Sequence, residues 1–512
     1  MQLNVIKQEI GVDESLNKSN LEQNIDADIT LPDYCPDVLR ILKCAVIPKI
    51  NSVNVSAGRA TADGNAQIKI IYVSSNGLVN CFEQDFPFSK YIELKDDSEE
   101  NCVKVRAKTD YVNCRAVSSR RLDVHSCVNV SFNCCKLKKN ELITGVEEDF
   151  LQMKKCDIES VSVQGLTQRN FSMSETAVIG DDKPNIKNII DSSACTVLSD
   201  IKVINNKLLI KGELIVDIIY CSEGEQSDIE SFEHSMPISQ IIEINGIKDD
   251  NKCSVDLEII SLNTEIKTDS SGENKLVDIS ALIDARVTAT SEENLSVAVD
   301  AYSIAGDVKL EHKNMSFYLL EESLDETFLC RSQLDLSSVG AQKILAFWCS
   351  DITKACSFNN SEFTVDGTFT AHFIYTDTDN STGYTERTVD FNFKRELKGD
   401  IKSFKANPNV QITGTTATCT SQGETDIKVE LKISCDIYSC RDINIISSIE
   451  PVESGDEPKR SSSIVIYFAD SGETLWDIAR RYKTSVEAIQ RENSLNDEEA
   501  MEEKRMLLIP RA

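Results

Sequence analysis

The chain has 512 residues, with 84 acidic and 54 basic side chains, so its formal net charge is −30 and its pI is about 4.6. This charge argues against a nucleic-acid-binding protein, because binding to phosphates is driven mainly by Lys and Arg. It argues equally against attachment to an anionic membrane surface. Hydrophobic residues make up 41% of the chain, which is ordinary for a folded soluble protein, and the length predicts three or four domains.

The first 20 residues contain no apolar segment followed by a cleavage site, as a secretory signal would. No later segment approaches the roughly 18 apolar residues of a membrane-spanning helix. We therefore expect a cytoplasmic protein without direct membrane insertion. The chain has 18 Cys and no C-x-x-C motif, so we expect reduced thiols that pack as small apolar side chains rather than a metal site. Later oxidative cross-linking is the alternative.

In chain order, residues 1–30 are polar with scattered apolar positions and are compatible with an added strand. Pro36 suits the first turn of a short helix, with Val38, Leu39, Ile41 and Leu42 on its apolar side. The next elements are a strand over residues 67–73, a type I′ hairpin signal at Asn76 and Gly77, and a strand of period two over residues 122–134.

The same pattern recurs further along the chain. Pro36 and Gly64 are as far apart in the sequence as Pro184 and Gly212. The distance from Gly to Tyr is also the same in three places: Gly64–Tyr72, Gly212–Tyr220 and Gly367–Tyr375. The copy of the pattern that contains Pro184 predicts a second short helix. A third short helix is predicted over residues 341–347, where the Pro is absent. Late strands are predicted at residues 276–287 and 427–433. The fold class is therefore mainly β, with three tandem β-rich repeats that carry short helices, at residues 1–150, 160–318 and 319–452.

Residues 453–463 are rich in Pro, Gly, Ser and charge, which predicts a linker. Beyond them, residues 464–512 predict a small α+β module in the order strand, helix, helix, strand. Thr474 and Asp477 form a capping box for its first helix, and Thr484 and Glu487 form one for its second helix. Residues 506–509 are the closing strand.

This module resembles a LysM module. The residues that carry the resemblance are Ser471, Gly472, Glu473, Thr474, Leu475, Trp476, Ile478, Ala479, Tyr482, Val486, Asn493, Leu495, Leu508, Ile509 and Pro510. The resemblance implies a shallow groove for N-acetylglucosamine polymers. Lys483 and Lys504, however, stand where LysM modules usually carry Gly, and the second loop is acidic at residues 497–503. Both features favour a protein ligand over a sugar.

The three tandem units followed by this module resemble the SPOCS-domain family of endospore-forming bacteria, in particular the spore coat morphogenetic proteins of the SipL type. The resemblance implies a scaffold in the mother-cell cytoplasm, at the forespore surface and spore coat. It implies docking of a SpoIVA-like coat morphogenetic ATPase through the LysM module, with other coat proteins or a second copy as further partners. A protein that binds peptidoglycan or N-acetylglucosamine at the cortex or wall is the alternative. The partner-binding residues we expect are Ile464, Ser471, Gly472, Glu473, Thr474, Leu475, Trp476, Asn493, Leu495 and Met501.

Nothing in the sequence predicts an enzyme or a cofactor. The four His residues are scattered, and no phosphate-binding loop, H-E-x-x-H helix or nucleophile elbow occurs. Asp377 to Gly383 superficially resembles a calcium loop, but the position that requires Gly holds Thr382, so a turn is predicted there. We therefore expect no catalytic residues and no metal site.

Overall fold

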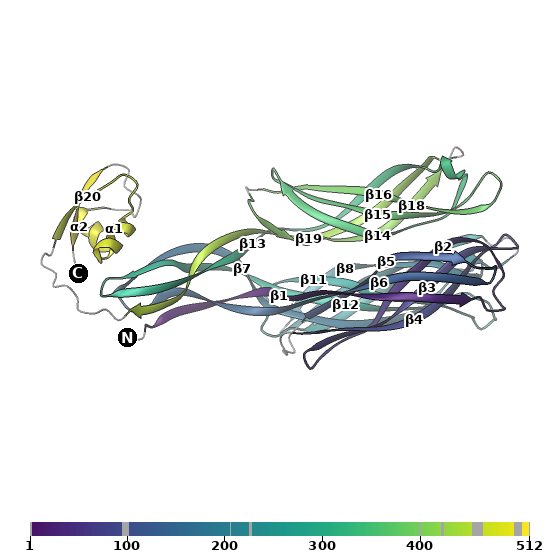
Figure 1. Cartoon of the computed structure of the whole chain (residues 1–512), viewed down its shortest axis with the longest axis horizontal. Helices are drawn as coiled ribbons and strands as arrows, with labels where there is room; N and C mark the ends of the chain where they lie inside the picture. Colours follow the sequence, from purple (N-terminus) through teal and green to yellow (C-terminus); the bar gives the residue numbers. More distant parts are fainter. Residues whose placement is uncertain are drawn as a thin grey trace.

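The computed structural model describes residues 3–94, 102–204, 206–224, 228–398, 401–420, 424–452, 464–495 and 504–510. The molecule is elongated (Figure 1). Twisted sheets are gathered at one end, long two-stranded ribbons run from them toward the other end, and the small helical module lies beyond the ribbon tips. The chain is mainly β, as the sequence predicts.

One order of strands occurs three times. A long strand comes first, a three-stranded meander follows, and shorter strands lead into a second long strand that pairs with the first. The first unit contains β1 (Val5–Thr30), β2 (Val38–Ser56), β3 (Arg59–Ser74), β4 (Val79–Glu93), β5 (Cys102–Ala116) and β6 (Arg121–Val146). The second contains β7 (Leu151–Val178), β8 (Ile186–Ile204), β9 (Lys207–Ser222), β10 (Ile229–Glu243), β11 (Lys252–Lys267) and β12 (Leu276–Ser303). The third contains β13 (Asp307–Asp335), the 3-10 turn η1 (Ser337–Val339), β14 (Lys343–Asn359), β15 (Glu362–Thr376), β16 (Thr382–Glu396), β17 (Phe404–Ala406), β18 (Asn409–Cys419) and β19 (Glu424–Val452).

The expected edges at residues 160 and 318 fall inside the continuous strands β7 and β13. The strands instead change from one unit to the next at the short turns between β6 and β7 and between β12 and β13. The predicted linker, residues 453–463, lies outside the described residues.

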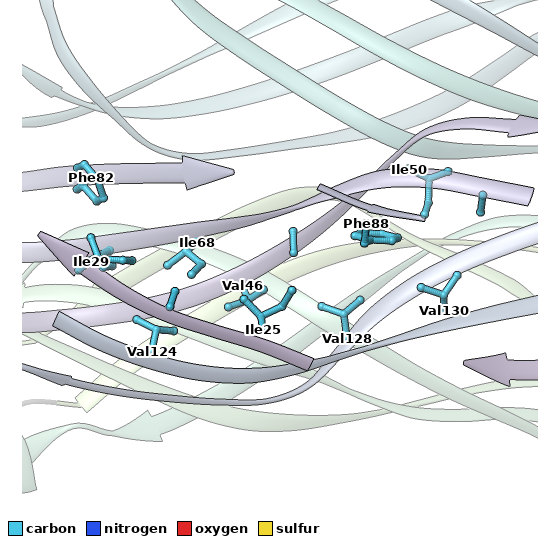
Figure 2. Close-up of a cluster of buried hydrophobic side chains, with 14 of the residues drawn as sticks. Ile25, Ile29, Val46, Ile50, Ile68, Phe82, Phe88, Val124, Val128 and Val130 are labelled. Atoms are coloured by element: carbon cyan, nitrogen blue, oxygen red, sulfur yellow. The ribbon is translucent and has the colours of Figure 1, made fainter. Parts of the chain in front are cut away.

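Each unit is a two-layer sandwich. In the first, the sheet β1-β6-β5 packs on the sheet β2-β3-β4, because alternate residues of both sheets point inward and are apolar. Figure 2 shows this core, with Ile25 and Ile29 of β1, Val124 and Val128 of β6, and Ile68 of β3 facing one another between the layers. The second and third units bury equivalent clusters between their own two sheets.

The three units meet along their meander sheets. Ile71 of β3, Ile219 of β9 and Ile374 of β15 belong to one buried cluster, and the repeat places them at equivalent positions. A separate buried cluster joins the ribbons, with Ile10 of β1, Ile158 of β7 and Phe317 of β13 among its members. The three units therefore share cores at two levels along the long axis.

The recurring glycines have a steric cause. A Cβ on Gly64, Gly212 or Gly367 would lie 2.4, 2.4 or 2.1 Å from a backbone carbonyl oxygen of the neighbouring strand. No side chain fits at such a contact. The recurring tyrosines also share a role, since Tyr72 and Tyr220 donate from their hydroxyls to the carbonyl oxygens of Pro36 and Pro184, at 3.1 and 3.2 Å.

The three short helices predicted in the units are wrong. Residues 38–42, 186–190 and 343–347 are the first residues of the strands β2, β8 and β14. Each strand opens with at least one β-bulge; β2 has register shifts between Val38 and Arg40 and again between Ile41 and Lys43. An extra residue at each bulge turns the period of two into a spacing of three or four, which imitates a helical face.

Two predicted turns form, with one difference. β3 and β4 are joined as expected, but Gly77 has φ +80° while Asn76 does not have a positive φ. The turn is thus not of type I′. Asp377 lies in the turn between β15 and β16, where its carboxylate accepts from the backbone N–H groups of Asp379 and Ser381 at 2.9 and 2.8 Å.

The C-terminal module has the predicted βααβ order, with β20 (Ile464–Ala469), α1 (Leu475–Tyr482), α2 (Val486–Asn493) and β21 (Arg505–Pro510). Thr474 caps α1 by accepting from the N–H of Asp477. The second cap is Ser485 rather than Thr484. Thr484 is buried instead, and its carbonyl oxygen accepts a hydrogen bond that is described below.

Candidate functional site

The C-terminal module lies against the turn that joins β12 to β13, at the tips of the long ribbons. Tyr302, near the end of β12, belongs to the hydrophobic core of the module. Its ring meets the indole of Trp476 edge to face, with centroids 4.8 Å apart, and its hydroxyl donates to the carbonyl oxygen of Thr484 at 2.8 Å. Such an aromatic pair contributes about 0.5–1.5 kcal/mol beyond the area that it buries.

Charged side chains surround this aromatic contact. Asp300 accepts from the indole N–H of Trp476 at 2.8 Å and from the guanidinium of Arg480 at 2.9 Å. Lys483 pairs with Asp307 at 2.7 Å, across the same turn of the ribbon. Acidic groups of the ribbon thus face basic groups of α1, and the module is held in one orientation on the ribbon tip.

Trp476, which the sequence predicts as a partner-binding residue, is only 9% exposed. Its contacts in this structure are with Asp300 and Tyr302 of the same chain. Lys483 adopts the left-handed conformation at the end of α1, with φ +52°. A lysine is thus accommodated where LysM modules usually have Gly, and its ammonium reaches Asp307 from there.

Several other predicted partner-binding residues have roles inside the module. The carboxylate of Glu473 accepts from the N–H of Asp470, the hydroxyl of Tyr467 and the guanidinium of Arg481, and these bonds lower the pKa of Glu473. Asn493 ties α2 to β21, because its amide exchanges hydrogen bonds with the backbone of Leu508 at 2.6 and 2.7 Å.

The remaining predicted residues are divided between core and surface. Leu475 is fully buried, and Leu495 packs against the same core. Ser471 and Gly472 are exposed in the loop before α1, where Gly472 has φ +91°. Thr474, at the start of α1, is partly buried. Met501 and the acidic loop at residues 496–503 lie outside the described residues.

A different surface of the module is exposed and apolar. β20 and β21 form a two-stranded sheet whose inner face covers the helices. Its outer face presents Ile464, Ile466, Phe468 and Met506, which are 47%, 60%, 70% and 53% exposed. We call these four residues the outer strip. Of these four, only Ile464 was predicted from the sequence to bind a partner. The signal for the others was that residues 464–468 are apolar on both faces of the strand.

A cavity of about 920 Å³ lies between the sandwiches, and strands of all three units line it. Its charged groups include Arg106, Asp256 and Glu258, which are already engaged in ion pairs: Arg106 with Glu258 at 2.5 Å, and Lys104 with Asp256 at 2.8 Å. Among the residues that the structure describes, no cluster of three His, Cys, Asp or Glu side chains could hold a metal ion.

No helix in the described ranges is long and apolar enough to cross a membrane. The helices of the module, α1 and α2, have eight residues each.

Comparison with protein families gives two kinds of domain. The model described as "SipL, SPOCS domain" matches residues 37–117 and 185–267, which correspond to β2–β5 of the first unit and β8–β11 of the second. The model of the LysM domain matches residues 470–510. No curated protein and no solved structure matches the chain. Both matched models describe binding domains rather than catalytic ones, and the chain is a protein of SipL SPOCS and LysM domains.

Proposed function

We propose that this protein is a non-enzymatic adaptor in endospore coat assembly, which acts in the mother-cell cytoplasm at the forespore surface. Its LysM domain docks a coat morphogenetic ATPase, and its sandwiches contact other coat proteins or a second copy of the chain. The SPOCS and LysM matches support a role in spore coat assembly. The third unit, β13 to β19, repeats the strand order of the two matched units, so we treat it as a further SPOCS-type unit.

The observation that carries the docking proposal is the outer strip. Four large apolar side chains share one exposed face, with Phe468 at 70% exposure and Ile466 at 60%. Burying such side chains contributes roughly 1.5–3 kcal/mol each. A protein surface can cover all four side chains at once, and exposed apolar patches of this kind mark sites of protein–protein contact.

The predicted loop residues extend the same proposal. Ser471 and Gly472 are exposed next to the end of β20, so a partner on the outer strip would also reach this loop. Trp476 takes a different place in the proposal, because it fixes the domain on the ribbon and thereby determines where the outer strip points.

The test is co-purification of the coat morphogenetic ATPase with the full chain and with Phe468→Glu and Ile466→Glu. We expect recovery to fall at least about tenfold, since a buried apolar contact would become an unpaired buried charge. Arg491→Glu is the matched control, because it places a glutamate at an exposed position of α2, outside the strip. Unchanged recovery with both strip variants would remove the strip from the interface.

The second candidate is binding to peptidoglycan through the LysM domain, which the LysM match favours. Sedimentation with purified peptidoglycan decides between the two. Saturable binding that chitin oligomers abolish, and that Phe468→Glu leaves intact, would support the glycan function in place of the adaptor.

A further inference from the structure

Two buried cysteines of the first unit face each other across neighbouring strands. Cys102 of β5 and Cys135 of β6 are directly paired in the antiparallel register, and their side chains are 4% and 7% exposed. Their thiols are in hydrogen-bonding contact, and the thiol of Cys135 also lies 3.7 Å from the carbonyl oxygen of Cys102. Directly opposed residues of antiparallel strands have Cα atoms about 4.5–5.5 Å apart, within the range of about 4.4–6.8 Å that a disulfide needs.

A partly buried cation from the second unit lies beside this pair. Arg286 of β12 pairs with the carboxylate of Asp13 of β1 at 2.5 Å. Its Nε and the Oδ1 of Asp13 are buried and have no hydrogen-bond partner among the described residues. Contact with the Cys102 thiol lowers the pKa of Cys135, and the charge of Arg286 adds to this. Desolvation and the carboxylate of Asp13 act in the opposite direction, and the net shift is downward, while the pKa of Cys102 is raised. A thiolate next to a guanidinium is the reactive form of cysteine.

We propose that Cys135 and Cys102 form a peroxide-reactive dithiol site, in which Cys135 is the attacking thiol, Cys102 is the resolving thiol and Arg286 is a positioning residue. The neighbouring strands, the contact between the thiols and the adjacent guanidinium carry this assignment. The ligand class is a small hydroperoxide, because only a small molecule can enter so closed a site.

The reaction balances with hydrogen peroxide as the oxidant. The thiolate of Cys135 attacks one peroxide oxygen, the O–O bond breaks, and the leaving hydroxide takes up the proton that the thiol had lost. Cys135 is then a sulfenic acid and one water has formed. The sulfur of Cys102 attacks the sulfur of Cys135, the S–O bond breaks, and the second hydroxide leaves as water with the proton of Cys102. Two thiols are oxidised to one disulfide, and one peroxide is reduced to two waters.

The chain contains an internal comparison for the role of Arg286. Cys44 and Cys114 also have thiols in contact, and both are less buried than the first pair. Contact with the Cys44 thiol lowers the pKa of Cys114 although desolvation and the carboxylate of Asp123 oppose this, so this pair also has one thiol of lowered pKa. It differs in that no guanidinium stands among the groups that act on either thiol. If access alone governed oxidation, Cys44–Cys114 would react first. If the guanidinium governs it, Cys102–Cys135 reacts first.

The experiment treats the reduced full chain with limiting hydrogen peroxide and maps disulfides by mass spectrometry over time. We expect the peptide of Cys102 linked to that of Cys135 to appear first. Cys102→Ser should stop this product and leave a sulfenic acid on Cys135 that dimedone labels. Cys134→Ser is the matched control, since it removes a buried neighbouring thiol of β6 and should leave the Cys102–Cys135 disulfide unchanged.

Arg286 is tested by a pair of variants. Arg286→Lys keeps a positive charge and should retain most of the rate, whereas Arg286→Gln should slow disulfide formation about tenfold, the change that one pKa unit in the thiolate fraction would give. Thermal unfolding of each variant shows whether it is folded. The proposal is overturned if Cys44–Cys114 forms first in the folded wild-type chain, if Cys135 stays unlabelled in folded Cys102→Ser, or if Arg286→Gln reacts at the wild-type rate.

Discussion

The indole N–H of Trp476 donates a 2.8 Å hydrogen bond to Oδ2 of Asp300, a residue 176 positions earlier in the chain. This bond joins the LysM domain to the end of β12, next to the turn into β13. Hydrogen bonds to a charged group contribute about 1.5–3 kcal/mol. The bond is shielded by Tyr302, whose ring packs on the indole.

The first prediction concerns this bond. In a double-mutant cycle with Trp476→Phe and Asp300→Ala, we expect a coupling of about 1–3 kcal/mol, because each change removes the same contact. Hydrogen exchange of the α1 amides measures it, since undocking exposes that helix. Asp300→Asn is the conservative control: it keeps an acceptor for the indole but weakens the pair with Arg480. Strictly additive effects would mean that the bond does not hold the domain.

The second prediction concerns a repeat glycine. Gly212→Ala should destabilise the second sandwich by about 1–3 kcal/mol, because the new Cβ would lie 2.4 Å from the carbonyl oxygen of Val197 and the backbone would have to move. Gly145→Ala is the matched control, since its nearest neighbour is the end of the flexible Ile6 side chain at 3.3 Å. Thermal unfolding of both variants measures the difference. Equal midpoints would contradict the steric argument.

The third prediction concerns His372, which is buried where the three units meet. Burial, followed by the nearby ammonium of Lys43 at 3.2 Å, lowers the pKa of His372 to about 3. In the unfolded chain the pKa of a histidine is about 6.5. Because the pKa is lower in the folded state, His372 contributes stability at pH values above about 6.5, and this contribution is lost as the pH falls toward 3. Lowering the pH from 8 to 5 should therefore reduce the free energy of unfolding by up to about 2 kcal/mol through this group.

His372→Gln checks this pH dependence. The amide keeps an acceptor or donor near the hydroxyls of Ser350 and Tyr384, which contact the imidazole at 2.7 and 2.8 Å. We expect the unfolding midpoint of the variant to fall less than that of the wild type from pH 8 to pH 5. A fall of the same size in both proteins would show that His372 does not set this dependence.

The fourth prediction concerns Asp284, whose dependence on pH has the opposite sign. Desolvation raises the pKa of Asp284 to about 6, although Gln168 donates to both its oxygens at 2.9 and 3.0 Å. In the unfolded chain the pKa of an aspartate is about 3.9. Because the pKa is higher in the folded state, the contribution of Asp284 to stability is complete below about pH 3.9 and is lost as the pH rises through 6. Asp284→Asn should therefore stabilise the fold by about 1–2 kcal/mol at pH 8 and by less at pH 5.

Unfolding midpoints of wild type and Asp284→Asn at the two pH values measure this gain. Asp278→Asn serves as the control, because Asp278 lies on the same strand and its side chain is 41% exposed. A gain for Asp284→Asn that does not grow between pH 5 and pH 8 would contradict the desolvation argument.

The sequence predicted much of this fold because its signals are local. Alternation over residues 122–134 located β6, and the common spacing from Gly64 to Tyr72 and from Gly212 to Tyr220 marked equivalent strands. Gly64 and Gly212 could be found because a close backbone approach permits no other residue. The starts of β2, β8 and β14 were missed, since bulges there distort the period on which strand prediction depends.

The site was predicted less well for a different reason. Trp476 was predicted as a partner-binding residue, but its ring is buried against Tyr302, which is distant in sequence. No periodicity connects two residues so far apart. Phe468 and Ile466 were readable as strand residues, yet their exposure follows from which face of the sheet the helices cover, and only the tertiary structure gives this.

The long ribbons have a mechanical consequence. β13 alone runs for 29 residues, and at about 3.3 Å per residue it extends for roughly 95 Å. It is hydrogen-bonded to β19 over that distance, and three such paired strands share a common core, so the assembly should resist bending as a rod does. A load applied to the LysM domain would pass through Asp300 and Tyr302 into this rod and reach the sandwiches at the far end, which makes the protein a spacer of fixed length between whatever is bound at its two ends.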